Sequence, residues 1–128
     1  MSHYHVAVWL DHSEAHVLHV SPDDVEASIV RPAETHPHLH VRRGVIGDGR
    51  LAEDRQYFQD IAQAIGDARE ILVVGPSTAK LAFIKYLAKH DPQRMEHVVG
   101  VETVDHPTDA QLVVHARHYF KVKDRMLP

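Results

Sequence analysis

The chain has 128 residues, 13 histidines, no cysteine and a formal net charge of -4 at pH 7. This length suits one domain with its own core, and the lack of cysteine excludes disulfides, thiolate metal sites and a cysteine nucleophile. The negative charge excludes a protein that coats nucleic acid through bulk electrostatics, so any RNA contact must be local. No apolar stretch approaches the ~20 residues that span a bilayer, and the first residues do not resemble a secretory signal. We therefore expect a cytoplasmic protein with no membrane contact.

The first thirty residues predict three antiparallel strands. Side chains alternate in character from Tyr4 to Leu10, which is the period of a strand with one face more deeply buried. Turn formers at 11–14 and 21–24 separate this strand from the apolar runs Ala15–Val20 and Val25–Val30. From Arg31 to about Gly49 the pattern gives way to Pro, His, Arg and Gly, and loops of that length are usually functional or mobile.

The remainder alternates helices with strands. Helical spacing predicts a helix from near Leu51 to Gly66, and an aliphatic run predicts a strand over Ile71–Val74. A second helix is capped by Ser77 and closed at Asp91, and a strand over Val98–Val104 follows it. A capping box at Thr108 opens the last helix, and we expect a frayed tail from Lys121. Hairpins followed by strand-helix units favour a mixed five-stranded sheet with three helices. If the fourth strand pairs with the first, the spatial order is 3-2-1-4-5.

That order brings the carboxyl ends of strands one, four and five together, where open α/β sheets tend to bind ligands. Asp11, Asp105 and His106 would meet there and could hold Mg²⁺ or Mn²⁺ for phosphodiester cleavage. The simpler interpretation treats Asp11 and Asp105 as turn and strand-end residues, because nucleases of this type of fold collect three or four acidic groups. We favour this interpretation, and a metal-dependent phosphodiesterase remains the enzymatic alternative.

Three histidines alternate in the long segment. His36, His38 and His40 would point the same way on an extended chain and could contribute to a zinc or nickel site. The same spacing also arises in exposed loops without metal, and the sequence assigns no fourth ligand. No cofactor is therefore expected, with a divalent metal as the alternative.

Basic residues interleaved with glycine form a candidate RNA contact. Arg42, Arg43, Arg50 and Arg55 could follow an RNA backbone, and solvated loop charge is the alternative. Lys80 ends a small-residue turn at 75–80, whose amides would suit a phosphate. The turn lacks the second glycine of a phosphate-cradling loop, so a tight strand-to-helix connection is favoured.

The order of these elements resembles the middle domain of archaeal and eukaryotic class I peptide-chain release factors and of Pelota, over most of the chain. The most specific match is residues 71–80, followed by the strand that ends at Asp105. The resemblance implies one ribonuclease H-like domain over residues 1–128. Small single-domain bacterial proteins labelled "translational machinery protein" are also similar.

The chain departs from release factors at their catalytic loop. Release factors carry Gly-Gly-Gln before the first helix, and residues 40–50 here read HVRRGVIGDGR. The resemblance therefore does not imply peptide release, whereas Pelota also lacks the tripeptide, so a ribosome contact without hydrolysis remains compatible. We expect a non-enzymatic translation accessory factor that binds the ribosome or RNA through residues 31–50. A homo-oligomer without a nucleic-acid role is a further alternative.

Overall fold

Five strands and four helices make up the part of the chain that the structure, a computed structural model, describes: residues 4–32 and 46–125, with side chains from 55 to 123 in the second range. In chain order they are β1 (His5–Leu10), β2 (Ala15–Val20), β3 (Val25–Val30), α1 (Ile46–Ile65), β4 (Glu70–Gly75), α2 (Ala79–His90), α3 (Pro92–Met95), β5 (Val98–Thr103) and α4 (Asp109–Arg125). The three long helices are the three that the sequence predicts. Only the short α3 is additional.

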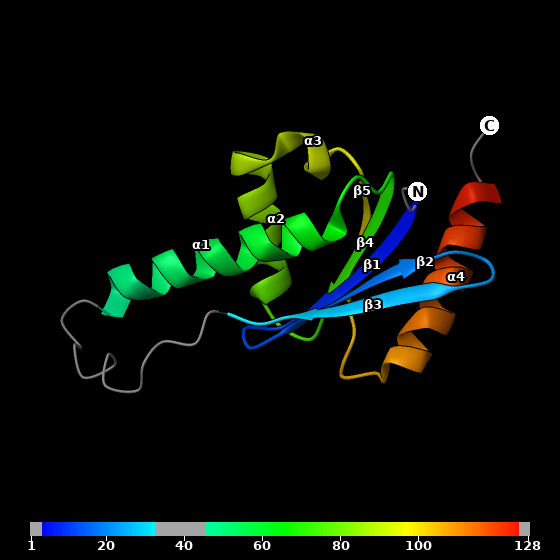
Figure 1. The fold of residues 1–128 in the computed structure, drawn as a ribbon, viewed down its shortest axis with the longest axis horizontal. Coiled ribbons are helices and arrows are strands. Elements are labelled where there is room, and N and C mark those ends of the chain that lie inside the picture. The colour runs from blue at the N-terminus through cyan, green and yellow to red at the C-terminus, as the bar shows by residue number, and fades with distance from the viewer. Residues whose placement is uncertain (1–3, 33–45, 126–128) are drawn as a thin grey trace.

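The strands form one mixed sheet with the order β3-β2-β1-β4-β5, which confirms the predicted topology (Figure 1). At its centre, Val8 of β1 lies between Val17 of the antiparallel strand β2 and Val73 of the parallel strand β4. β3 extends the sheet antiparallel to β2, and β5 extends it parallel to β4. Tight turns reverse the chain between the first three strands, whereas helices return it between the parallel ones.

Helices on both faces of the sheet divide the core into two layers (Figure 1). Val6 and Val8 point to the layer that contains side chains of α1 and α2, and Ala7 and Trp9 point to the layer beneath α4. Successive residues of a strand face opposite sides, so a central strand between two helical layers is buried throughout. This explains why β1 is buried from Val6 to Leu10.

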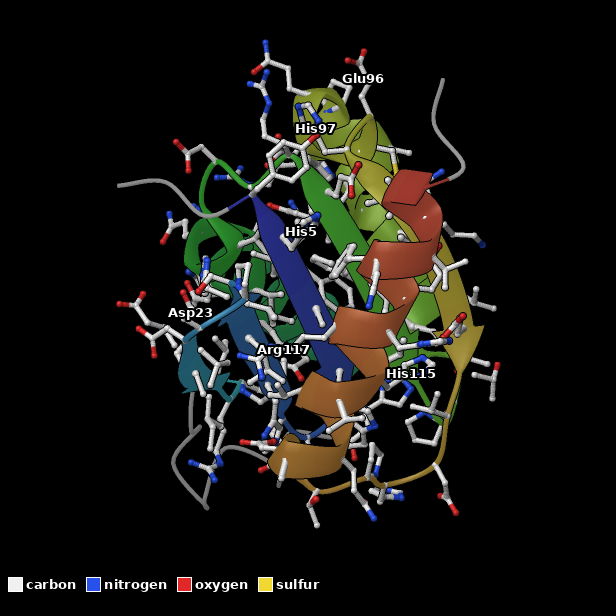
Figure 2. All side chains as sticks on the ribbon, turned by 90° about the vertical axis from the view of Figure 1, so that its right-hand side faces the viewer. His5, Asp23, Glu96, His97, His115 and Arg117 are labelled. Atoms are coloured by element: carbon white, nitrogen blue, oxygen red, sulfur yellow. The ribbon has the colours of Figure 1, made fainter. Side chains whose placement is uncertain are left out.

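The edge strand β3 is much more exposed than its neighbours. Val25 is 37 % exposed and Ile29 is 48 % exposed. α4 lies across the sheet and reaches the turn before β3, where Arg117 donates hydrogen bonds to the carbonyls of Ser21 and Asp24 (Figure 2). This contact ties α4 to the β2–β3 turn and leaves the outer strand largely uncovered.

Two predicted helix limits are wrong. α1 begins at Ile46, inside the segment that the sequence assigns to a loop. The prediction missed this start because Gly47 and Gly49 lower the helix propensity of these residues. α4 runs to Arg125 instead of fraying from Lys121. Its final turns continue from Phe120, which is 3 % exposed and belongs to the core layer beneath α4.

Helix caps follow the sequence signals in part. Thr108 and Gln111 form the predicted capping box, with reciprocal hydrogen bonds of 2.9 and 3.1 Å between side chain and backbone. Gly66 adopts a φ of 71° directly after α1, as a glycine stop signal predicts. The prediction for α2 is wrong, because its N-cap residue is Thr78 instead of Ser77 and makes no side-chain cap bond.

Candidate functional site

The carboxyl ends of β1, β4 and β5 meet at one edge of the sheet. Gly75 makes this close approach possible, because a Cβ atom at that position would lie 2.2 Å from the carbonyl oxygen of Leu10. The amide of Val104 donates to the Gly75 carbonyl at 3.0 Å. The indole Nε1 of Trp9 donates to the carbonyl of Asp105 at 2.7 Å. These contacts fix the segment after β5 against the end of β1.

The predicted residues Asp11, Asp105 and His106 lie together at this edge. His106 places Nδ1 3.0 Å from Asp105 Oδ1 and Nε2 3.9 Å from Asp11 Oδ2. Asp11 Oδ1 accepts hydrogen bonds from the amides of Ser13 and Glu14 and from the Ser13 hydroxyl. Burial alone would raise the pKa of Asp11, but these hydrogen bonds and the nearby His106 outweigh it and lower the pKa.

This arrangement has the geometry of a turn beside a strand end. The Asp105 side chain is 95 % exposed, and Asp11 uses one oxygen to hold residues 13 and 14. Among the residues that the structure describes, no group of three or more His, Asp or Glu side chains is placed to hold a metal ion. In the described structure Asp11 and Asp105 thus lie as turn and strand-end residues, and the metal-dependent phosphodiesterase alternative stays a prediction.

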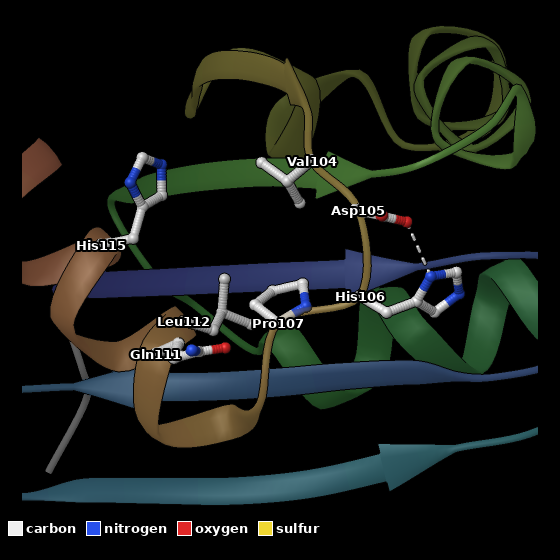
Figure 3. Close-up of a pocket in the computed structure, with 7 residues that line it drawn as sticks. All are labelled: Val104, Asp105, His106, Pro107, Gln111, Leu112 and His115. Atoms are coloured by element: carbon white, nitrogen blue, oxygen red, sulfur yellow. Dashed lines mark hydrogen bonds and ion pairs between the residues drawn. The ribbon is translucent and has the colours of Figure 1, made fainter.

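A hollow of about 520 Å³ lies between the segment after β5 and the first turns of α4 (Figure 3). His106 and His115 stand at opposite ends of the view, with Pro107 and Leu112 between them. His115 is already paired with Glu102, with 2.7 Å between Nε2 and Oε1. The hollow therefore has an apolar floor, and the polar side chains at its rim already interact with other groups of the protein.

A smaller hollow of about 190 Å³ adjoins it and holds His16 between two carboxylates. His16 Nδ1 lies 2.8 Å from Asp109 Oδ1, and Nε2 lies 2.8 Å from Glu14 Oε2. Burial alone would lower the pKa of His16, but the two carboxylates outweigh it and raise the pKa. The hydrogen bond from His16 is in turn the main reason that the pKa of Glu14 is lowered. This charged bridge joins β2 to the first turn of α4.

Lys80 interacts within the protein. Lys80 is 6 % exposed, and its Nζ donates to the carbonyl of Ser77 at 2.7 Å. The turn at 75–80 thus uses its lysine internally, because the ammonium closes the first turn of α2. The assignment of Lys80 as an RNA contact stays a prediction, and the proposal made below does not use it.

The other predicted contact residues fall partly outside the described structure. Arg42 and Arg43, and the histidines His36, His38 and His40, lie outside the described residues. The backbone of Arg50 belongs to α1, but its side chain is also outside the description. Arg55, five residues further along α1, is described and exposed.

Arg55 borders a third hollow, between α1 and α2, with a volume of about 450 Å³. The described residues that line it include the basic side chains Arg55, Lys85, Lys89 and His90 and no carboxylate. Its aromatic wall comes from Phe58 of α1 and Tyr86 of α2. The hollow therefore combines positive charge with aromatic surface on the face of the molecule opposite α4.

Sequence reasoning missed the contribution of α2 to this hollow. Lys85 and Lys89 are spaced i, i+4, as are Tyr86 and His90, and this spacing places each pair on one side of a helix. That signal was available from the sequence. The convergence with Arg55 depends on how α2 packs against α1, and the sequence alone does not give that packing.

No protein-family model matches the chain, and no curated protein matches it significantly. Solved structures do match. Pelota from Archaeoglobus fulgidus aligns with a TM-score of 0.58 and 15 % identity over 99 % of this chain and 32 % of its own. The archaeal translation termination factor aRF1 gives 0.53 and 14 % over 92 % of this chain and 40 % of its own. Dom34 from S. cerevisiae, described as a translation termination-like factor involved in RNA quality control pathways, gives 0.51 and 10 % over 94 % and 38 %.

The chain thus spans about a third of the length of these proteins, and the identities are low enough that the likeness concerns the fold. Among the described residues, no helix is both long and apolar enough to cross a bilayer. The matched region has the five-stranded order that the sequence predicts. The chain therefore has the fold of a middle domain of the release-factor and Pelota type.

Proposed function

We propose that this chain is a non-enzymatic translation accessory factor that binds the ribosome or RNA. The single observation that carries the proposal is the hollow between α1 and α2, which gathers four basic groups and no described carboxylate on a chain of net charge -4. Positive charge concentrated on one face is the usual electrostatic footprint of nucleic-acid binding.

The fold also supports a role in translation. Its structural neighbours include a translation termination factor and a termination-like factor involved in RNA quality control. A shared fold does not fix a function, so the site must carry the argument. Residues 40–50 contain no Gly-Gly-Gln, which leaves binding without peptide release as the role that the resemblance allows.

The proposed contact surface has two parts. One is the segment from Arg31 to Arg50 with Arg42 and Arg43, which leads into α1. The other is the α1–α2 hollow, to which Arg55 belongs. Both parts would contact phosphates, so binding should weaken as salt concentration rises.

Ribosome co-sedimentation at about 50 mM and about 200 mM salt tests the proposal. We expect binding at low salt that falls steeply at high salt, and weaker binding in Arg42→Ala/Arg43→Ala and in Lys85→Ala/Lys89→Ala. Lys121→Ala/Lys123→Ala removes the same charge from α4 on the opposite face and serves as the matched control. Equal loss in all three variants would indicate nonspecific charge effects, and no sedimentation of the wild type with ribosomes or ribosomal RNA would refute the proposal.

A further inference from the structure

We infer that the hollow between α1 and α2 binds single-stranded RNA, with one base stacked on Tyr86 beside His90. The inference rests on the proposed function and deepens it, because it names the form of RNA and the side chain that receives a base. It depends on three features of the hollow: positive charge that no described carboxylate pairs, its ordered aromatic rings and its size.

The positive side chains are free to meet phosphates. Within the described part of the chain, Arg55, Lys85 and Lys89 form no ion pair with a carboxylate, and all three are exposed. Lys85 and Lys89 lie one helical turn apart on α2, and Arg55 faces the same hollow from α1. Cations on two sides of a groove suit a backbone that passes along it.

The aromatic rings run from the core to the surface. Phe83 is fully buried, and its ring centroid lies 5.6 Å from that of Phe58. Phe58 lies 5.8 Å from Tyr86, and Tyr86 lies 5.0 Å from His90 with an angle of 36° between the planes. Tyr86 is half-buried and His90 is exposed. Because packing already holds Tyr86 in place, little side-chain freedom is lost when a base stacks there.

The dimensions and chemistry favour a single strand over a duplex. A volume of about 450 Å³ lies within the range of small-ligand pockets and can admit a base with its sugar. In a duplex the faces of the bases are covered by their neighbours, so duplex RNA could use the cations but not the rings. Stacking on aromatic side chains tolerates any base, which predicts weak dependence on sequence.

The test measures fluorescence anisotropy of the full chain with labelled 12-nucleotide poly(U) and poly(A) RNA and with a duplex RNA of the same length. We expect the single strands to bind at least about tenfold more tightly than the duplex at moderate salt, because stacking is lost in the duplex. Lys85→Ala/Lys89→Ala should reduce the slope of log K against log salt by roughly 0.7 for each contact removed.

Tyr86 provides the decisive variants. Tyr86→Leu keeps an apolar side chain of similar reach but removes the ring, and should weaken single-strand binding about tenfold with little change for the duplex. Tyr86→Phe keeps the ring and should bind like the wild type. Circular dichroism and thermal melting confirm that each variant is folded, and Tyr119→Leu, which removes a ring on the opposite face, is the control matched to Tyr86→Leu.

The outcomes separate the inference from the proposed function. If Tyr86→Leu binds single strands as the wild type does, or if duplex and single strand bind equally, the inference fails while salt-sensitive ribosome binding can still stand. If the wild type binds neither ribosomes nor any of these RNAs, both fail together. Weakened oligonucleotide binding in Tyr86→Leu, with rescue by Tyr86→Phe, supports the inference.

Discussion

Replacing Gly75 with alanine should destabilise the protein more than any other glycine-to-alanine change at the described ends of its secondary-structure elements. The new Cβ would lie 2.2 Å from the backbone carbonyl oxygen of Leu10, and real Cβ contacts essentially never fall below 3.0 Å. The ends of β1 and β4 would therefore have to separate by at least 0.8 Å, the difference between these two distances. A backbone carbonyl in a buried strand cannot turn away as a flexible side chain can, so we expect a loss of about 3 kcal/mol in the free energy of unfolding.

Urea unfolding followed by circular dichroism measures this loss. With an m value of about 1.5 kcal/mol/M, the midpoint should fall by about 2 M. Gly66→Ala is the matched control, because nothing lies within 4 Å of its added Cβ and only the φ of 71° opposes the change. That strain should lower stability by about 1 kcal/mol. A midpoint shift in Gly75→Ala no larger than in Gly66→Ala would refute the argument that close strand approach requires this glycine.

Three further changes test the cap, the core and the charged bridge. Thr108→Ala removes a capping-box hydroxyl and should lower the free energy of unfolding by about 1 kcal/mol in urea titrations, whereas an unchanged midpoint would show that the cap is dispensable. Phe83→Ala empties a fully buried position and should lower it by about 3 to 5 kcal/mol, and a loss below about 1 kcal/mol would contradict its placement in the core. The pKa of His16 is raised in the folded state, so its stabilisation is complete below its ordinary value of 6.5 and disappears as pH rises through the raised pKa. The pKa of Glu14 is lowered, so the stabilisation that Glu14 contributes disappears as pH falls below 4.5. The melting temperatures of wild type and His16→Gln should therefore differ most between pH 4.5 and 6.5 and converge at high pH. A difference that stays constant with pH would exclude the bridge from His16 to Glu14 and Asp109.

The fold could be predicted because its signals are local. The strands are defined by the alternation from Tyr4 to Leu10, by two turn-forming tetrapeptides and by one aliphatic run. Because connections between strands follow a few rules, only a few sheet orders are possible. The capping box at Thr108 is equally local and was also predicted. By contrast, the start of α1 could not be read from residues 46–49, because glycines there weaken the helical pattern.

The candidate site was less predictable, because it depends on which side chains meet across helices. The sequence suggested that Lys80 could contact a phosphate, but the residue is buried and its ammonium donates a hydrogen bond to the carbonyl of Ser77. Lys85 and Lys89 carried no motif, and only the packing of α2 against α1 sets them opposite Arg55. A residue's position on its own helix follows from spacing, whereas its neighbours on the next helix follow from the whole core.

Trp9 is the chain's single tryptophan, and it is 5 % exposed. Its ring centroid lies 5.6 Å from that of His16 and 5.2 Å from that of His106. Its emission consequently reports on one corner of the molecule, the layer beneath α4. A ligand entering the hollow beside α4 would change the signal, whereas RNA seated between α1 and α2 would leave it nearly untouched. The unlabelled protein thus carries its own means of telling which of its two faces a partner has reached.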